Sequence, residues 1–204
     1  MAGLTAAQAR IHHAALRLFA EKGSAAVTMS ELALAAGVAR GTVHNNLDSP
    51  EDLFNTVAAQ LSGEMHQRVV ASFKGIEDPA HRLANGIRFF VRRAHEEPHW
   101  GRFINRFAFS NESLRGMWAG PPTQDILLGI AQRRYDFPQE QLPTVIAMIA
   151  GTVLSAMFLV LEGHRAWRDA GSDAAELVLR AMGVPVEDAR KLSRAELPPL
   201  SASE

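Results

Sequence analysis

The stretch His95-Glu-Glu-Pro-His99 contains the residue types and spacing that could most directly do chemistry. Two histidines four residues apart on one helical face can bind zinc, and the glutamate between them can activate a bound water. Pro98 breaks the helix that this geometry requires. Arg102 and Asn105 stand where the extended protease pattern has a glycine and a third histidine. We therefore interpret HEEPH as the end of a helix and expect no metal site.

Composition limits the function classes that remain. The chain has 204 residues, is 47% hydrophobic, carries a formal net charge of -1 and contains no cysteine. These values are typical of a globular protein with one large core or two small ones. The lack of cysteine excludes disulfides, thiolate catalysis and cysteine-bound zinc. No nucleophile, base and orienting group can be assembled from the sequence, so we expect neither an enzyme nor a cofactor.

The segment from Leu142 to Leu161 contains no charged residue and is long enough to cross a bilayer. Pro143 marks a natural helix start, and small polar residues dilute the hydrophobicity. We interpret it as a helix buried on several sides, with a membrane helix as the alternative. The N-terminus lacks the basic and apolar regions of a secretory signal, so we expect a protein that stays in the cytoplasm.

Start and stop signals divide the N-terminal part into three short helices, with the third over about residues 39–46. A tight turn separates the second helix from the third, which makes the pair a helix-turn-helix candidate. The signals are two capping boxes, Thr5 with Gln8 and Thr28 with Glu31, and the terminating glycines Gly23 and Gly37.

Helical periodicity continues through the rest of the chain, and no β pattern of convincing length appears. The predicted fold class is therefore all-α. In chain order we expect a helix from Ser49 and Pro50 toward Phe73, one from Asp78 to Pro98, a short one over 99–109, one reaching Arg134 after a break at 120–122, the charge-free helix, and one capped by Ser172 that ends at Gly183.

The stretch IHHAALRLFAEKGSAAVTMSELALAAGVARGTVHNNLDSPEDLF resembles the DNA-binding domain of the tetracycline-repressor-like (TetR) family of transcription regulators. The shared features are paired alanines and LF-x-E-x-G in the first helix, a capping threonine before the second, and AGV-x-x-GT at the turn. The resemblance implies a helix-turn-helix DNA-binding domain over residues 1–50 and a helical ligand-binding and dimerisation domain over 51–194. We expect residues 195–204 to be a disordered tail.

The resemblance implies a repressor that binds palindromic operator DNA as a homodimer and is released by a small-molecule effector. By analogy the third helix faces the double-stranded DNA. Arg40 can pair with guanine or phosphate, and Asn45 can read adenine. The alternative is that these are solvated polar residues on a short helix. The candidate DNA-binding residues are Thr28, Ser30, Arg40, Gly41, Thr42, His44 and Asn45.

Three positions depart from the family pattern. His44 replaces a tyrosine, Leu47 a phenylalanine and Pro50 a lysine, and residues 1–64 contain four basic and six acidic residues. We therefore expect DNA binding that is weaker or more narrowly specific than usual. The alternative function is a helical enzyme or small-molecule-binding module that has lost DNA binding.

Aromatic residues and arginines are concentrated in the second domain, which predicts a pocket for an apolar or amphipathic effector. An arginine such as Arg92 is available to an anionic group on that effector. The alternative is that the aromatic residues form an ordinary core. The candidate pocket residues are Phe89, Arg92, Trp100, Phe103, Phe107, Trp118, Met148 and Phe158.

The charge-free helix is apolar around too much of its circumference for one small domain to cover. Its small residues permit close approach by another helix, and a second stripe lies near residue 178. We expect two helices per subunit to form a four-helix interface with two-fold symmetry. The candidate interface residues are Ala147, Gly151, Leu154, Ser155, Leu177, Val178 and Ala181.

Overall fold

The computed structural model describes residues 5–47 and 52–200, and helices are the regular elements throughout these ranges. The all-α prediction is confirmed. The helices are α1 (Ala6–Lys22), α2 (Met29–Ala36), α3 (Arg40–Asn46), α4 (Leu53–Ala71), α5 (Pro79–Glu96), α6 (Pro98–Phe107), α7 (Glu112–Ala119), α8 (Pro121–Ala131), the 3-10 turn η2 (Gln139–Gln141), α9 (Leu142–Leu161), α10 (Trp167–Ala181) and α11 (Val186–Arg194).

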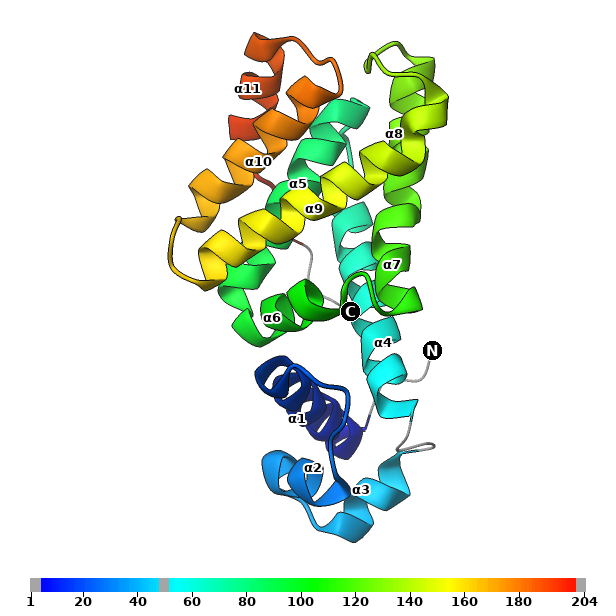
Figure 1. Cartoon of the computed structure of the whole chain (residues 1–204), viewed down its shortest axis with the longest axis vertical. Coiled ribbons are helices and arrows are strands. Elements are labelled where there is room, and N and C mark those ends of the chain that lie inside the picture. The colour runs from blue at the N-terminus through cyan, green and yellow to red at the C-terminus, as the bar shows by residue number, and fades with distance from the viewer. Residues whose placement is uncertain (1–4, 48–51, 201–204) are drawn as a thin grey trace.

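Helices α1 to α3 gather at one end of the long axis, and the remaining helices form the larger body above them (Figure 1). Helix α4 connects the two parts: it contacts α1 at its start and runs beside α7. Helices α5, α9 and α10 pack against one another and form the centre of the larger body. The chain thus has a small helix-turn-helix part and a large helical part that share α4.

Local signals in the sequence predicted the N-terminal helices. Both capping boxes are present, with the Thr5 and Thr28 hydroxyls accepting from the backbone amides of Gln8 and Glu31. Gly23 and Gly37 end α1 and α2 at φ 65° and 64°, in the left-handed region that glycine adopts without steric cost. The predicted start of α4 at Ser49 and Pro50 lies outside the described residues.

Helix α9 spans the residues predicted for the charge-free helix. Its length and composition would suffice to cross a membrane, with a mean hydropathy of 2.4. In the structure it crosses α5 and also packs on α6 and α10 (Figure 1). Part of its apolar surface therefore lies in the core of the chain, whereas side chains such as Phe158 and Leu159 remain exposed.

The C-terminal region differs from the sequence prediction in three respects. Helix α10 begins at Trp167, so Ser172 lies inside it instead of capping it. Helix α11 was not predicted, although acidic residues in its first turn and basic residues in its last turn suit a helix dipole. Residues 195–200 contain Leu197 and Leu200 packed against the core, where disorder was expected; residues 201–204 lie outside the described residues.

Candidate functional site

Helix α3 presents a polar outer face. Val43 is completely buried and anchors the helix, whereas Arg40, Gly41, His44 and Asn45 are exposed. Because residues one turn apart share a helical face, these four positions form a single surface. Arg40 has no ion-pair partner among the described residues, so its guanidinium is available to an external acceptor. This arrangement is what a helix needs to enter a major groove.

The remaining candidate DNA-binding residues take other positions. Thr42 is partly buried, and its backbone carbonyl accepts a hydrogen bond from the side-chain amide (Nδ2) of Asn46 at 2.8 Å. The Thr28 hydroxyl is engaged in capping α2, where it donates to the Glu31 carboxylate at 2.9 Å. Ser30 lies in the first turn of α2, partly buried. Thr28 and Ser30 therefore lie at the N-terminus of α2, where the Glu31 carboxylate already accepts from the Thr28 backbone amide at 2.9 Å.

Helices α1 and α2 are tied together by an ion pair. The ammonium of Lys22 lies 2.6 Å from the Glu31 carboxylate, and hydrogen bonds from this ammonium and from Thr28 lower the pKa of Glu31 to about 2. Of the three departures from the family pattern, Leu47 still packs against the core and His44 is exposed. Pro50 lies outside the described residues.

The HEEPH stretch ends one helix and begins the next, as predicted. Helix α5 stops at Glu96, Glu97 has φ -126° and ψ 76°, and Pro98 is the first residue of α6. Both glutamates of the motif are engaged by arginines, Glu96 by Arg92 at 2.7 Å and Glu97 by Arg93 at 3.1 Å. Within residues 5–47 and 52–200, no group of three or more metal-ligating side chains occurs.

A cavity of about 90 Å³ lies in the larger body, between α4, α5, α7, α8 and α9. Helix α4 contributes one stripe of its surface to the lining, and α9 contributes the apolar side chains of Ile146, Ile149 and Val153. The lining residues are Ser62, Met65, His66, Val69, Val70, Phe73, Arg82, Leu83, Gly86, Ile87, Phe90, Met117, Trp118, Pro122, Asp125, Ile126, Ile146, Ile149 and Val153.

The few polar groups in this lining are mostly paired with one another or with backbone. The Arg82 guanidinium lies 2.9 Å from the Asp125 carboxylate and donates to the Ile76 carbonyl at 2.6 Å. The Ser62 hydroxyl donates to the Ser113 carbonyl at 2.9 Å. The cavity therefore presents an apolar interior with a neutralised ion pair at one side.

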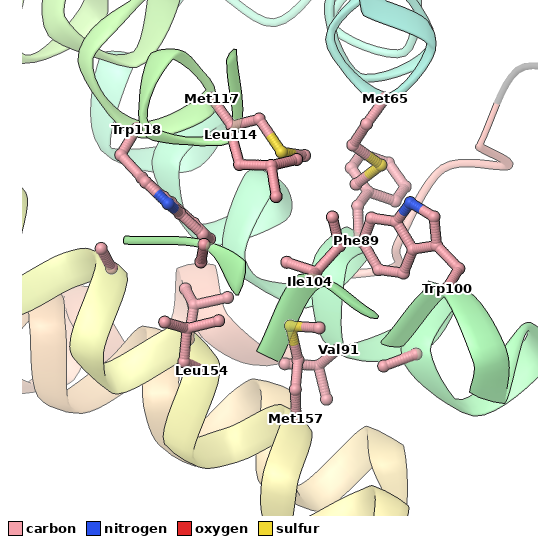
Figure 2. Packing of buried hydrophobic residues seen from close by; sticks show 14 of the residues in the cluster. Met65, Phe89, Val91, Trp100, Ile104, Leu114, Met117, Trp118, Leu154 and Met157 are labelled. Atoms are coloured by element: carbon pink, nitrogen blue, oxygen red, sulfur yellow. The ribbon is translucent and has the colours of Figure 1, made fainter. Parts of the chain in front are cut away.

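Of the eight candidate pocket residues, Trp118 lines the cavity and the other seven do not. Figure 2 shows Trp118 pointing from α7 toward Leu154, with Trp100 on the other side of the core. The rings of both tryptophans contact Phe90, at 5.1 and 5.8 Å between centroids, and the sequence analysis missed Phe90. The other six are placed as follows: Phe89 is buried core, Phe103 and Phe107 join an aromatic cluster, Arg92 pairs with Glu96, Met148 is partly buried, and Phe158 is exposed.

Phe103 and Phe107 of α6 turn toward the helix-turn-helix part instead of toward the cavity. Phe103 and Phe107 contact Phe54 of α4 at 5.5 and 4.9 Å, and Phe54 contacts Phe19 of α1 at 5.2 Å. The Arg106 side chain lies directly over Gly23, at the end of α1. This cluster joins the helix-turn-helix end of the chain to the body that contains the cavity.

The candidate dimer residues fall into two groups. Ala147, Ser155, Leu177 and Ala181 are exposed on α9 and α10, and Gly151 is partly exposed. Leu154 and Val178 are buried within the chain: Leu154 lies next to Trp118 of α7 (Figure 2), and Val178 belongs to α10, which packs on α5 and α9. The outer face of the pair also includes Phe158, which is 51% exposed and had been predicted to line the pocket.

A helix-turn-helix end joined to an all-helical body with an internal cavity defines a class of regulators that bind DNA. Residues 11–57 match the family of bacterial regulatory proteins named after tetR, and residues 78–195 match the tetracycline repressor-like C-terminal domain. The chain belongs to the TetR family of transcriptional regulators. Members of this family bind DNA and small-molecule ligands and generally dimerise.

Individual relatives agree with this assignment. The helix-turn-helix regulator BetI of Rhizobium meliloti is 33% identical over 106 residues, which cover 50% of this chain and 52% of BetI. An uncharacterised regulator of the same type from Mycobacterium tuberculosis is 30% identical over 89 residues, 44% of each chain. The matched region thus spans about half the length of these curated relatives. Both are named as transcriptional regulators, which are not enzymes.

Solved structures share the fold over nearly the whole chain. A TetR regulator from Shewanella sp. PV-4 has a TM-score of 0.75 at 20% identity, covering 89% of this chain and 100% of that one. The structure of RolR in complex with resorcinol has a TM-score of 0.68 at 24% identity, covering 96% of both chains.

Proposed function

We propose that this protein is a cytoplasmic repressor that binds palindromic operator DNA as a homodimer and leaves it when a largely apolar small molecule occupies the cavity. The observation that carries the proposal is the combination, in one chain, of an exposed polar face on α3 and an apolar cavity bordered by α4. Helix α4 touches both α1 and the cavity, so a change at one site has a physical route to the other.

The proposed dimer uses the outer face of α9 and α10. That face carries Ala147, Ser155, Phe158, Leu177 and Ala181, a mixture of small and large apolar side chains that suits helix packing. A two-fold pairing of these helices would hold two copies of α3 at a fixed spacing. Regulators of this kind read half-sites roughly 34–36 Å apart, or a multiple of that distance.

The proposed effector is a largely apolar compound. The cavity lining supports this choice through residues such as Phe90, Ile149 and Trp118. RolR, a protein of the same fold, has been solved in complex with resorcinol, a small ring compound. Arg92, considered as a partner for an anionic effector, lies outside the cavity lining and pairs with Glu96.

A second candidate function is a small-molecule-binding module without DNA binding. The excess of acidic over basic residues in positions 1–64 favours it, because phosphate binding gains most of its affinity from positive charge. The cavity is compatible with either function. The two candidates differ in whether the protein selects a DNA sequence.

Selection from a random DNA library with the purified full-length protein tests the proposal. A repressor of this kind should enrich a palindrome whose half-sites are about one helical turn apart or a multiple of that. The same selection with an Arg40→Ala, Asn45→Ala double variant is the matched control, since both residues are exposed and their loss leaves the core intact. Enrichment of no sequence by the wild-type protein would favour the second candidate.

A further inference from the structure

The size of the cavity restricts its occupant. Its volume of about 90 Å³ is well below the roughly 300–1,000 Å³ of sites that hold drug-sized ligands. Phe90, Ile149 and Val153 are among the side chains that bound it, and all three are apolar. An occupant that fits without rearranging this lining is about the size of a single substituted ring or a short branched chain.

The charges in the lining restrict its occupant further. Arg82 and Asp125 neutralise each other at 2.9 Å, and a second donor of Arg82 is used by the Ile76 carbonyl. An anion entering the cavity would lose its water without gaining an unpaired cation, and a cation would meet an already paired carboxylate. The lining therefore favours an uncharged molecule.

His66 is one of two side chains of the lining, with Trp118, whose polar atoms make no hydrogen bond to the described residues. It is partly buried on α4, and it has no hydrogen-bond partner among the described residues. Ser62, one turn earlier, already donates to Ser113. A neutral imidazole offers one donor and one acceptor, which match a hydroxyl or a carbonyl group. The buried indole N–H of Trp118 is likewise without a partner.

We propose that the cavity binds a small, uncharged, apolar molecule carrying one hydroxyl or carbonyl group, and that His66 hydrogen-bonds that group. This inference rests on the proposed function, since it specifies the chemistry of the proposed effector. The ring or chain of the ligand lies against the apolar floor around Phe90 and Ile149. The polar group of the ligand points toward α4, which carries His66.

Isothermal titration calorimetry of the full-length protein with three probes of similar size tests this inference. Benzyl alcohol has the neutral hydroxyl, toluene lacks it, and benzoate is anionic. Benzyl alcohol should bind with one site per chain, and both toluene and benzoate should bind roughly tenfold or more weakly. His66→Leu should lower the affinity for benzyl alcohol by roughly fivefold to tenfold, close to that for toluene.

Two control variants separate the cavity from nonspecific effects. His13→Leu removes an exposed histidine of α1 and should leave all three affinities unchanged. Ile149→Trp fills the cavity and should abolish binding of benzyl alcohol. Benzoate binding as tight as that of benzyl alcohol, an unchanged affinity in His66→Leu, or no binding of any probe would each overturn the inference.

The outcome is independent of the test of DNA binding. A protein that selects a palindrome but binds none of the three probes would keep the proposed function and lose the ligand class. A protein that binds benzyl alcohol through His66 but selects no DNA would keep the ligand class and lose the repressor.

Discussion

The guanidinium of Arg93 on α5 lies 2.8 Å from the carboxylate of Glu64 on α4. It also lies 3.1 Å from Glu97, at the junction of α5 and α6, and 4.5 Å from the ring centre of Trp100. Arg93 is only 2% exposed. A buried cation persists when its charge is matched and its hydrogen bonds are made, so this cluster holds α4 against the α5–α6 junction. Its Nη1 also lies 3.7 Å from the Met65 sulfur, at the cavity wall.

Replacing Arg93 should therefore destabilise the fold. Arg93→Met removes the most buried cation of the cluster and leaves Glu64 and Glu97 with only the longer contacts to Arg68, at 3.3 and 3.4 Å, so the free energy of unfolding should fall by about 2–3 kcal/mol in urea denaturation. The neighbouring Arg92 also pairs with a glutamate but is more exposed, so Arg92→Met should cost less than about 1 kcal/mol. Equal losses in the two variants would contradict a special role for the buried position.

The contact between Gly23 and Arg106 gives a second stability prediction. Gly23 has φ 65°, and a Cβ added there would lie within 1.7 Å of the Arg106 Nη1 atom. Gly37 has φ 64° and open space around it. Gly37→Ala should cost about 1 kcal/mol through backbone strain alone, and Gly23→Ala should cost more because Arg106 must also move.

A double variant isolates that second cost. Arg106→Ala in the Gly23→Ala background should reduce the penalty of the glycine substitution to that seen at Gly37, measured by chemical denaturation in a double-mutant cycle. A penalty at Gly23 that is unaffected by Arg106→Ala would show that the arginine yields freely at this junction.

The N-terminal helices could be predicted because their limits are set by neighbouring residues. Capping by Thr5 and Thr28 and termination by Gly23 and Gly37 are local effects, and the structure has each of them. Ser172 shows the limit of such signals. It is a good capping residue, yet α10 starts at Trp167 without a side-chain cap, because packing on α5 and α9 stabilises the earlier turn.

The cavity could not be predicted in the same way, because its lining combines single faces of five helices. Aromatic residues close in sequence to Trp118 were expected to share its pocket, but α6 turns Phe103 and Phe107 toward Phe54 and Phe19. The lining residues of α4 and α8 mix apolar positions such as Val69 and Ile126 with polar ones such as His66, and no local pattern in the sequence marks them as neighbours. Similarly, because α9 is apolar on most of its circumference, its sequence does not show which of its faces is buried by other helices of the same chain.

The low pKa of Glu31 predicts an acid-sensitive link between α1 and α2. The folded-state pKa of about 2 lies below the ordinary glutamate pKa of 4.5, so the stabilisation is complete above pH 4.5 and is lost as the pH falls toward 2. Glu31→Gln keeps the capping hydrogen bond but loses the ion pair with Lys22. Thermal unfolding of this variant should therefore depend less on pH between 4.5 and 2 than that of the wild type; parallel pH profiles would contradict the assignment.

DNA affinity should reside in α3. If Arg40 contacts a base, Arg40→Ala should weaken operator binding by about 1–3 kcal/mol and relax the preference at one position of each half-site. Loss of a phosphate contact would instead weaken all sequences alike and lower the salt dependence. Arg168→Ala, at an exposed position of α10, is the control and should bind as the wild type. Fluorescence anisotropy with the selected palindrome and single-base variants measures both effects.

The burial pattern of α10 determines how the proposed dimer should be tested. Leu177 is 59% exposed on the outer face, whereas its neighbour Val178 is 2% exposed and packs inside the chain. Leu177→Glu should therefore give a folded monomer, because the charge is buried only when a second copy covers it. Val178→Glu should unfold the larger body, since its charge has no solvated position. Sedimentation and circular dichroism distinguish the two results. A wild-type protein that sediments as a monomer at micromolar concentration would rule out the interface. Undiminished operator binding by the Leu177→Glu monomer would show that DNA recognition does not depend on the dimer.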